Sequence, residues 1–292
     1  MATALLKRVL VAVEPSDDDA SLVIAHRIAA SFGASLEALQ VVPTAGWPDN
    51  DPSMVRVENG ATVQELETRV AERTGRPTSG LKATVVRGDP ASSIVAHAKE
   101  TQADLIVVGT HGRTGVERLV LGSVAESVIG SAPCPVLVAR SAAPNDGGVL
   151  AGCDLGTRMD PVIAFAGAFG RALSAPLTLL HTLEPNMSDA ALVASTFFSG
   201  VVPSQPDAET MSAVKEAARG ALQAELVAAN LEGQVEVATG PASTLLLARA
   251  SELPASVIVV GSHHRGRVAR LLLGSVANEV VRGAESHVLV VR

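Results

Sequence analysis

The sequence predicts an α/β protein built from two repeated, doubly wound domains, each a five-stranded parallel sheet flanked by helices. Three observations lead to this fold class. The chain has 292 residues, which is enough for two domains of ordinary size. Apolar runs rich in Val and Ile alternate with amphipathic segments, as in parallel sheets covered by helices. The same order of segments also occurs twice, so the chain contains an internal repeat.

The repeat is visible in the spacing of matching residues. Gly109 and Gly261 lie 152 residues apart, and so do Gly122 and Gly274. The closing segments PVLVAR and HVLVVR keep this offset, whereas the opening segments VLVAVEPS and VLAGCDLG lie 140 residues apart, so the second half has gained 12 residues. A small, polar, Pro- and Gly-containing segment separates the copies. We therefore expect domains at residues 1–141 and 149–292, joined by a linker at residues 142–148.

Five strands are expected in the first half, because five short apolar runs are bounded by turn residues. They are Arg8–Val13, Ser35–Val42, Lys82–Arg87, Asp104–Gly109 and Pro135–Arg140.

Helices are expected between these strands. The first is predicted to be capped by Ser16 and to end at Gly33, whereas its counterpart in the second half is predicted to have Asp160 as its cap and Pro161 at its first helical position. The other helices of the first half are predicted at Thr62–Thr74, Ala91–Thr101 and Ser123–Gly130.

The composition argues against several classes of protein. The formal net charge is −7 and no basic stripe is present, which argues against binding to nucleic acid or to anionic membranes. No apolar run approaches the roughly 18 residues that a membrane span needs. The two cysteines, Cys134 and Cys153, give neither a disulfide framework nor a metal-ligand cluster. We expect a cytoplasmic protein without a metal site, a nucleic-acid partner or a membrane partner.

The segment GTHGRTGVERLVLGS, Gly109–Ser123, follows an apolar strand and leads into a helix. Open α/β sheets bind ligands at the carboxyl ends of such strands. Ser123 with Glu126 three residues later is a capping-box pattern and predicts the helix start, whose N–H groups attract phosphate. Gly122 lets the backbone approach the anion. The spacing fits neither a Walker A loop nor the dinucleotide fingerprint, and an ordinary tight turn is the alternative.

The same segment resembles the universal stress protein family, whose ATP-binding members carry Gly, two residues, Gly, nine residues, then Gly-Ser or Gly-Thr. The opening strand, the turn at Gly88 and the segment PCPVLVAR extend the resemblance over the whole chain. The resemblance implies an adenine nucleotide alpha hydrolase-like fold in two tandem domains. It also implies that the last strands of the two domains pair within one chain, and it leaves open a homodimer and a protein partner of unknown identity.

The resemblance further implies an ATP site in the first half, with or without Mg²⁺. Glu14 stands where the family usually has Asp, which contacts the nucleoside, and Val41, with Val42 as the alternative, stands where a Val touches adenine. The implied contacts to ribose and phosphates are Val108, Gly109, Gly112, Gly122, Ser123 and Val124.

The second half departs from the pattern in a different way. It keeps an acid as Asp154 and retains Gly261, Gly274 and Ser275, but His264 replaces the second glycine of the motif. We therefore expect a weaker site in the second half.

The sequence thus predicts a nucleotide-dependent regulatory or interaction protein of the stress response. Two alternatives stay open: a scaffold or ligand-sensing module that binds no nucleotide, and a slow ATPase. We assign no catalytic residue, because phosphoryl transfer needs a positioned base and charges that stabilise the transferred group, and the sequence shows no distinct set of these.

Overall fold

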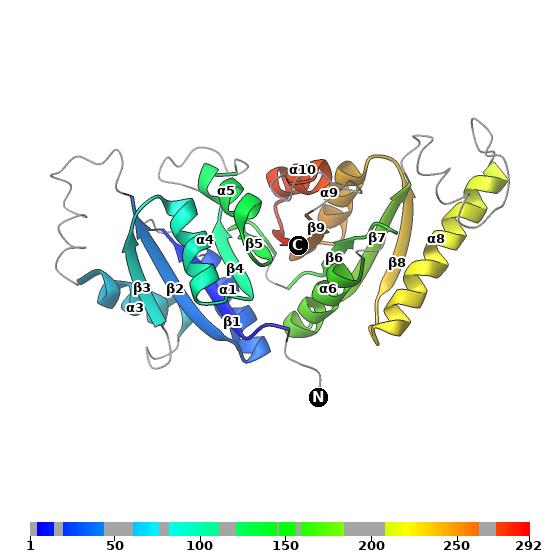
Figure 1. The fold of residues 1–292 in the computed structure, drawn as a ribbon. Coiled ribbons are helices and arrows are strands. Elements are labelled where there is room, and N and C mark those ends of the chain that lie inside the picture. The colour runs from blue at the N-terminus through cyan, green and yellow to red at the C-terminus, as the bar shows by residue number, and fades with distance from the viewer. Residues whose placement is uncertain are drawn as a thin grey trace.

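The two halves of the chain contribute their strands to one sheet (Figure 1). The computed structural model describes residues 5–14, 20–43, 61–75, 82–110, 121–144, 146–155, 159–183, 208–262 and 273–292. In the first half the strands are β1 (Arg8–Val13), β2 (Ser35–Val42), β3 (Lys82–Arg87), β4 (Leu105–Gly109) and β5 (Val136–Ala139). In the second half they are β6 (Val149–Gly152), β7 (Leu177–Leu183), β8 (Gln234–Thr239), β9 (Val257–Gly261) and β10 (His287–Val291).

Helices connect the strands within each half. The first half contains α1 (Ala20–Phe32), α3 (Ala61–Thr74), α4 (Pro90–Glu100) and α5 (Ser123–Ser131). The second half contains α6 (Met159–Leu173), α8 (Ala208–Ala228), α9 (Ala242–Glu252) and α10 (Ser275–Gly283).

The sheet has the strand order β3-β2-β1-β4-β5-β10-β9-β6-β7-β8. Within each half all neighbouring strands are parallel, and the order of the second half mirrors that of the first. The predicted fold class, two repeated doubly wound α/β domains, is confirmed. The five strands expected in the first half are found within one residue of the predicted bounds.

Two apolar cores lie on the two faces of the sheet, and each core extends through both halves. One core contains buried residues of α1, α3, α6 and α8, and the other contains buried residues of α4, α5, α9 and α10. The strands are buried on both faces because alternate residues of each strand enter different cores, which accounts for their nearly continuous apolar sequences.

The two halves meet where β5 and β10 pair antiparallel, with Leu137 opposite Leu289. These two leucines occupy the same position in the two repeats, so the pair lies on a pseudo-twofold axis. The expected pairing of the last strands within one chain is confirmed. Two arginines then cross between the halves: Arg140 Nη2 donates to the carbonyl of Val281, and Arg292 Nη2 donates to the carbonyl of Ile129.

Of the two predicted helix N-caps, Asp160 is contradicted by the structure and Ser16 lies outside the described residues. α6 begins at Met159, so Asp160 lies inside its first turn and the expected cap at Asp160 is wrong. Pro161 is the third helical residue and not the first, as was expected; the helix accepts a proline there because its first four N–H groups have no partner within the helix. Ser16 lies outside the described residues, whereas Gly33 ends the first helix as expected, with a φ of 64°.

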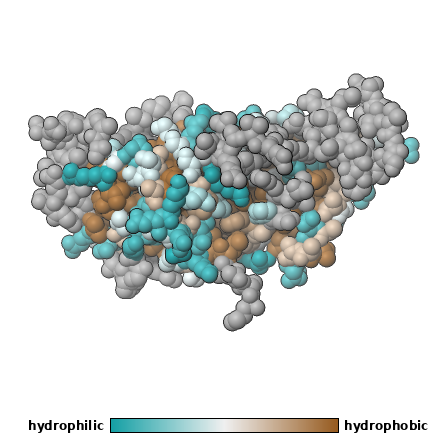
Figure 2. Space-filling view, in the orientation of Figure 1, coloured by the Kyte–Doolittle hydropathy of each residue, from teal (hydrophilic) through white to brown (hydrophobic). Residues whose placement is uncertain are grey.

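The face of the molecule in Figure 2 mixes hydrophilic and apolar residues. Among the described residues the exposed large apolar side chains are Leu5, Val23 and Val227. Within the described part of the chain, no helix combines the length and apolar character needed to cross a bilayer.

Candidate functional site

The order in which successive strands are added to the sheet reverses between β1 and β4, although the two strands are parallel. In the first half β2 and β3 lie on one side of β1, and β4 and β5 lie on the other side. The connecting helices change face at the same place, since α1 and α3 cover one core while α4 and α5 cover the other. Open α/β sheets form their ligand crevice at such a switch point, beyond the carboxyl ends of the strands. Glu14 and Gly109 lie at the carboxyl ends of these two strands, because Glu14 follows β1 and Gly109 is the last residue of β4.

The glycine-rich segment leaves the sheet and returns to it at one point. β4 ends at Gly109, the buried Thr110 follows, and the N–H of Gly122 donates to the carbonyl of Thr110 at 3.0 Å. The loop between them, which contains Gly112, lies outside the described residues. Thr110 and Gly122, the described residues on either side of this loop, are therefore held together beside the switch point.

The start of α5 corrects one prediction about the capping box. Gly122, not Ser123, is the N-cap residue, and the cap makes no side-chain hydrogen bond. Ser123 is the first helical residue and is exposed. The N–H groups of this first turn have no partner within the helix. Together with the helix dipole they favour an anion at the start of α5, from Ser123 onward.

Apolar side chains also lie near the carboxyl ends of these strands. Val41 at the end of β2 and Val124 in the first turn of α5 are both half-buried and pack against the core under α4 and α5. Val42 is only 5% exposed, so Val41 is the better candidate for an apolar contact with a ligand. The side chain of Val108 is 3% exposed and belongs to the same core, so only its backbone can contact a ligand.

Glu14 is held by a helix that sequence reasoning did not connect with it. Arg69 Nη2 in α3 donates to the carbonyl oxygen of Glu14 at 2.8 Å. Glu14 is half-buried, and its Oε2 is shielded from solvent. Arg69 thus fixes the backbone that carries the carboxylate at the end of β1. No local pattern could have indicated this contact, because 55 positions separate the two residues.

The second half repeats the arrangement with different side chains. The N–H of Gly274 donates to the carbonyl of Ser262 at 3.0 Å, and α10 begins at the exposed Ser275. Asp154 follows β6 and is exposed, and Gly261 ends β9. At the register position of Val41 stands Thr182, since Leu183 pairs with Thr239 as Val42 pairs with Arg87. His264 lies outside the described residues.

The cysteines do not supply a reactive thiolate to either site. Burial raises the pKa of Cys134 to about 12, and burial followed by the negative charge of Asp154 raises the pKa of Cys153 to about 12. Both thiols are therefore protonated at neutral pH. Within the described residues, no group of three or more His, Cys, Asp or Glu side chains could hold a metal ion.

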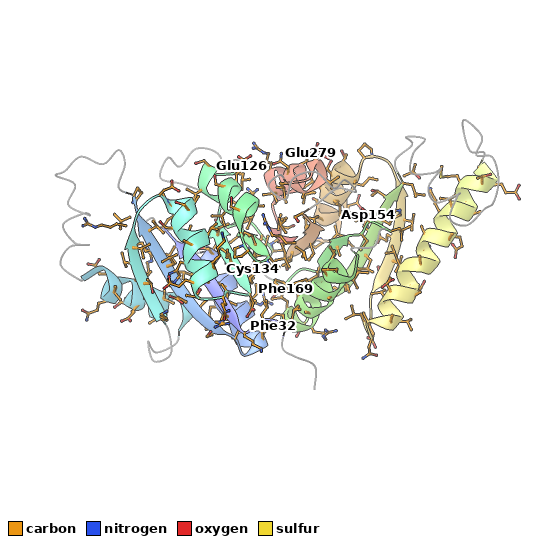
Figure 3. The ribbon with its side chains drawn as sticks, viewed as in Figure 1. Phe32, Glu126, Cys134, Asp154, Phe169 and Glu279 are labelled. Carbon is orange, nitrogen blue, oxygen red and sulfur yellow. The ribbon has the colours of Figure 1, made fainter. Side chains whose placement is uncertain are left out.

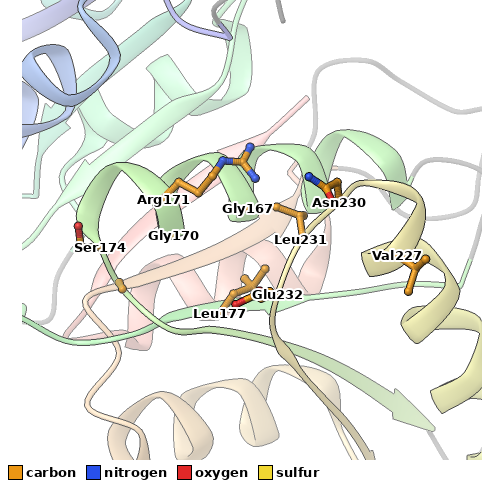
Figure 4. A pocket seen from close by; sticks show the side chains of 10 residues that line it. Gly167, Gly170, Arg171, Ser174, Leu177, Val227, Asn230, Leu231 and Glu232 are labelled. Carbon is orange, nitrogen blue, oxygen red and sulfur yellow. The ribbon is translucent and has the colours of Figure 1, made fainter.

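A pocket of about 590 Å³ lies away from both candidate sites (Figure 4). It is bordered by the end of α6, the start of β7 and the end of α8, at the amino end of the second half's strands. Ser174 and Asn230, which follow these two helices, have positive φ values of 53° and 51°. Helix C-termini present carbonyl groups and negative partial charge, so this pocket does not favour phosphate.

The fold is thus that of a tandem α/β protein. In each half a loop begins after a glycine at the end of a strand and ends at a glycine that caps a helix, and the Gly122–Thr110 and Gly274–Ser262 hydrogen bonds hold the ends of these loops beside the switch points. The model of the universal stress protein family matches residues 6–140 and 148–292. The chain therefore belongs to the universal stress protein family.

A curated relative agrees with this assignment, and solved structures are similar to the chain in fold. A universal stress protein of Mycobacterium bovis is 32% identical over 221 residues, which are 73% of this chain and 69% of that protein. A solved structure of a protein of unknown function from Pseudomonas aeruginosa has a TM-score of 0.70 at 22% identity and covers 98% of this chain and 92% of its own, which shows the same fold in both halves. Another solved universal stress protein is in complex with cAMP; it covers 48% of this chain and 99% of its own, at 24% identity and a TM-score of 0.37.

Proposed function

We propose that this universal stress protein binds ATP, mainly in the first half, and that the bound nucleotide regulates its interaction with a protein partner in the stress response. The observation that carries the proposal is the bond from Gly122 to Thr110, which places the start of α5 beside the end of β4 at the switch point. Phosphate would accept hydrogen bonds from the first-turn N–H groups of α5.

The other side chains of the first half fit the remaining parts of the ligand. Val41 and Val124 provide apolar surface for adenine, and a carboxylate at Glu14 can accept hydrogen bonds from ribose hydroxyls. Gly109 is exposed at the end of β4, where a close approach of backbone and ribose is possible. Glu14, Val41, Val108, Gly109, Gly112, Gly122, Ser123 and Val124 are the residues proposed for this site.

We propose a weaker site in the second half. Asp154, Gly261, Gly274 and Ser275 retain the acid and the anion-binding start of a helix, but Thr182 offers a less apolar surface than Val41. We also propose a cytoplasmic location, since the two cysteines are free and buried and a reducing compartment keeps thiols unpaired.

Gly109→Ala should weaken ATP binding about tenfold or more while leaving the free energy of unfolding within about 0.5 kcal/mol of the parent value. Among the described residues, a Cβ on Gly109 would meet nothing within 4 Å, so the fold accepts the methyl group. The methyl group would instead occupy space next to the ribose and phosphates. Nucleotide released from the denatured protein, followed by calorimetric titration with ATP, measures the loss.

Gly261→Ala is the matched control in the second half. Its Cβ would lie 3.5 Å from Val162 Cγ2, an ordinary contact. We expect this variant to retain most of the ATP binding. If the parent protein neither carries nor binds ATP, the proposed function is wrong. If both variants bind like the parent, the site is not at the ends of β4 and β9.

A further inference from the structure

The side chain of Arg282, in the second half, contacts α5, the helix whose start is proposed to bind phosphate in the first half. Arg282 lies in the last turn of α10, and its Nη2 donates to Glu126 Oε1 of α5 at 2.9 Å. Its Nε donates to Asn278 Oδ1 of its own helix at 3.1 Å. Figure 3 shows Glu126 in the part of the molecule where α5 and α10 lie side by side. The guanidinium therefore bridges the two helices.

Glu126 lies over the turn that is proposed to bind phosphate. It follows Gly122 by four residues and Ser123 by three, so all three residues share one side of α5. Side chains on a helix lean toward its N-terminus and cover the preceding turn. Glu126 thus lies within about one helical turn of the free N–H groups at the start of α5. Without a counter-charge it would repel a phosphate bound there.

The two halves differ at this position. Asn278 follows Gly274 by four residues in α10, as Glu126 follows Gly122 in α5, and it carries no charge. The first turn of α10 contains no acidic residue, whereas that of α5 contains Glu126. Among the described residues, the first turn of α5 thus carries a negative charge that the first turn of α10 lacks, and Arg282 of the second half pairs with that charge.

We propose that Arg282 is a positioning residue for the phosphates of ATP in the first half, acting across the domain boundary by neutralising Glu126. The proposal rests on the proposed function of the first-half site. It makes the second half part of that site, independently of whether the second half binds nucleotide itself.

The ion pair contributes little to the stability of the fold. The side chains of Arg282 and Glu126 are 49% and 51% exposed, and ion pairs this exposed to solvent add little to the stability of a protein. Loss of Arg282 should therefore leave the chain folded. The loss of Arg282 should instead change the affinity for a charged ligand, because it changes the net charge beside the start of α5.

Arg282→Ala should weaken ATP binding roughly 3- to 10-fold at low ionic strength, because an uncompensated carboxylate about one helical turn away repels the multiply charged phosphates. Adenosine binding should change less than about twofold, because adenosine carries no charge. The loss of ATP affinity should shrink as salt is raised toward about 0.5 M, since the charges are solvent-exposed and screened. Calorimetric titrations of the full chain with ATP and with adenosine, each at two salt concentrations, measure these effects.

Two further variants separate the charge effect from a structural one. Arg282→Lys should retain most of the ATP affinity, because it keeps the positive charge. Combining Glu126→Gln with Arg282→Ala should restore ATP binding to near the parent value, because no carboxylate then needs neutralising.

An equal loss of ATP and adenosine affinity in Arg282→Ala would overturn the inference, and so would a double variant as weak as Arg282→Ala alone. A parent protein that binds neither ligand would instead overturn the proposed function. The two failures are therefore distinguishable.

Discussion

Phe169→Ala should lower the free energy of unfolding by about 3–5 kcal/mol, which is the usual cost of deleting a fully buried aromatic ring. Phe169 lies in α6 with 0% of its surface exposed. Its ring centroid is 6.0 Å from that of Phe32 in α1, at an interplanar angle of 56°, so the two halves touch through these rings (Figure 3). The cavity would open in the core that both halves share. Urea unfolding followed by circular dichroism measures the loss.

Phe165→Ala is the matched control, because Phe165 lies one turn earlier on the same helix and is only half-buried. We expect a clearly smaller loss from this substitution. A double-mutant cycle of Phe32→Ala and Phe169→Ala should give a coupling of about 0.5–1.5 kcal/mol for the tilted ring pair. A loss below about 1.5 kcal/mol in Phe169→Ala would contradict the shared core.

The strands and the repeat could be predicted because their signals are local. Runs such as LIVVG and HVLVV are apolar at every position, since parallel strands here are buried on both faces. The fixed offset between the repeats also indicated that the last strands are equivalent, and these strands pair across the pseudo-twofold axis. The domain limits at residues 141 and 149 stay predictions.

Helix caps were harder to predict, because a cap depends on contacts outside the helix. Ser123 suits an N-cap position by residue type, but Gly122 takes that place while its N–H is tied to Thr110. The helix with the predicted cap Asp160 begins at Met159, two residues before the predicted first helical residue Pro161. A serine or aspartate near a helix start is therefore compatible with more than one first helical residue.

The candidate site was predictable in its backbone but not in its supporting contacts. The family resemblance pointed to Glu14, Val41 and Gly109, and these residues lie at or beside the carboxyl ends of β1, β2 and β4. The contacts of Arg69 with Glu14 and of Arg282 with Glu126 join residues 55 and 156 positions apart. Such pairs follow from how elements pack, and one sequence without aligned relatives does not contain that information. Gly112 and His264, which distinguish the two halves in sequence, lie outside the described residues.

The free energy of unfolding should fall by about 3 kcal/mol between pH 6.5 and pH 4 because of one histidine at the domain boundary. His287 begins β10 and is 7% exposed. Its Nδ1 accepts the backbone N–H of Arg140 at 3.0 Å, so this nitrogen carries no proton in the folded state. Burial, and then the positive charge of Arg27, lower the pKa of His287 from 6.5 to about 4.

The direction follows from the two protonation states. Above pH 6.5 the imidazole is neutral in both the folded and the unfolded chain, and it adds no pH dependence. Between pH 6.5 and 4 the unfolded chain binds a proton that the folded chain does not, so acid favours unfolding by up to about 1.4 kcal/mol per pH unit. Below about pH 4 both states are protonated and the contribution levels off.

His287→Asn isolates this contribution from that of the carboxylates, which also titrate in acid. An asparagine Oδ1 can accept the N–H of Arg140 in place of Nδ1, and the side chain does not titrate. Urea unfolding at several pH values between 7 and 4 should therefore give a flatter profile for the variant than for the parent, with the difference approaching about 3 kcal/mol near pH 4. Parallel profiles would mean that folding does not lower the pKa of His287, and they would contradict this prediction.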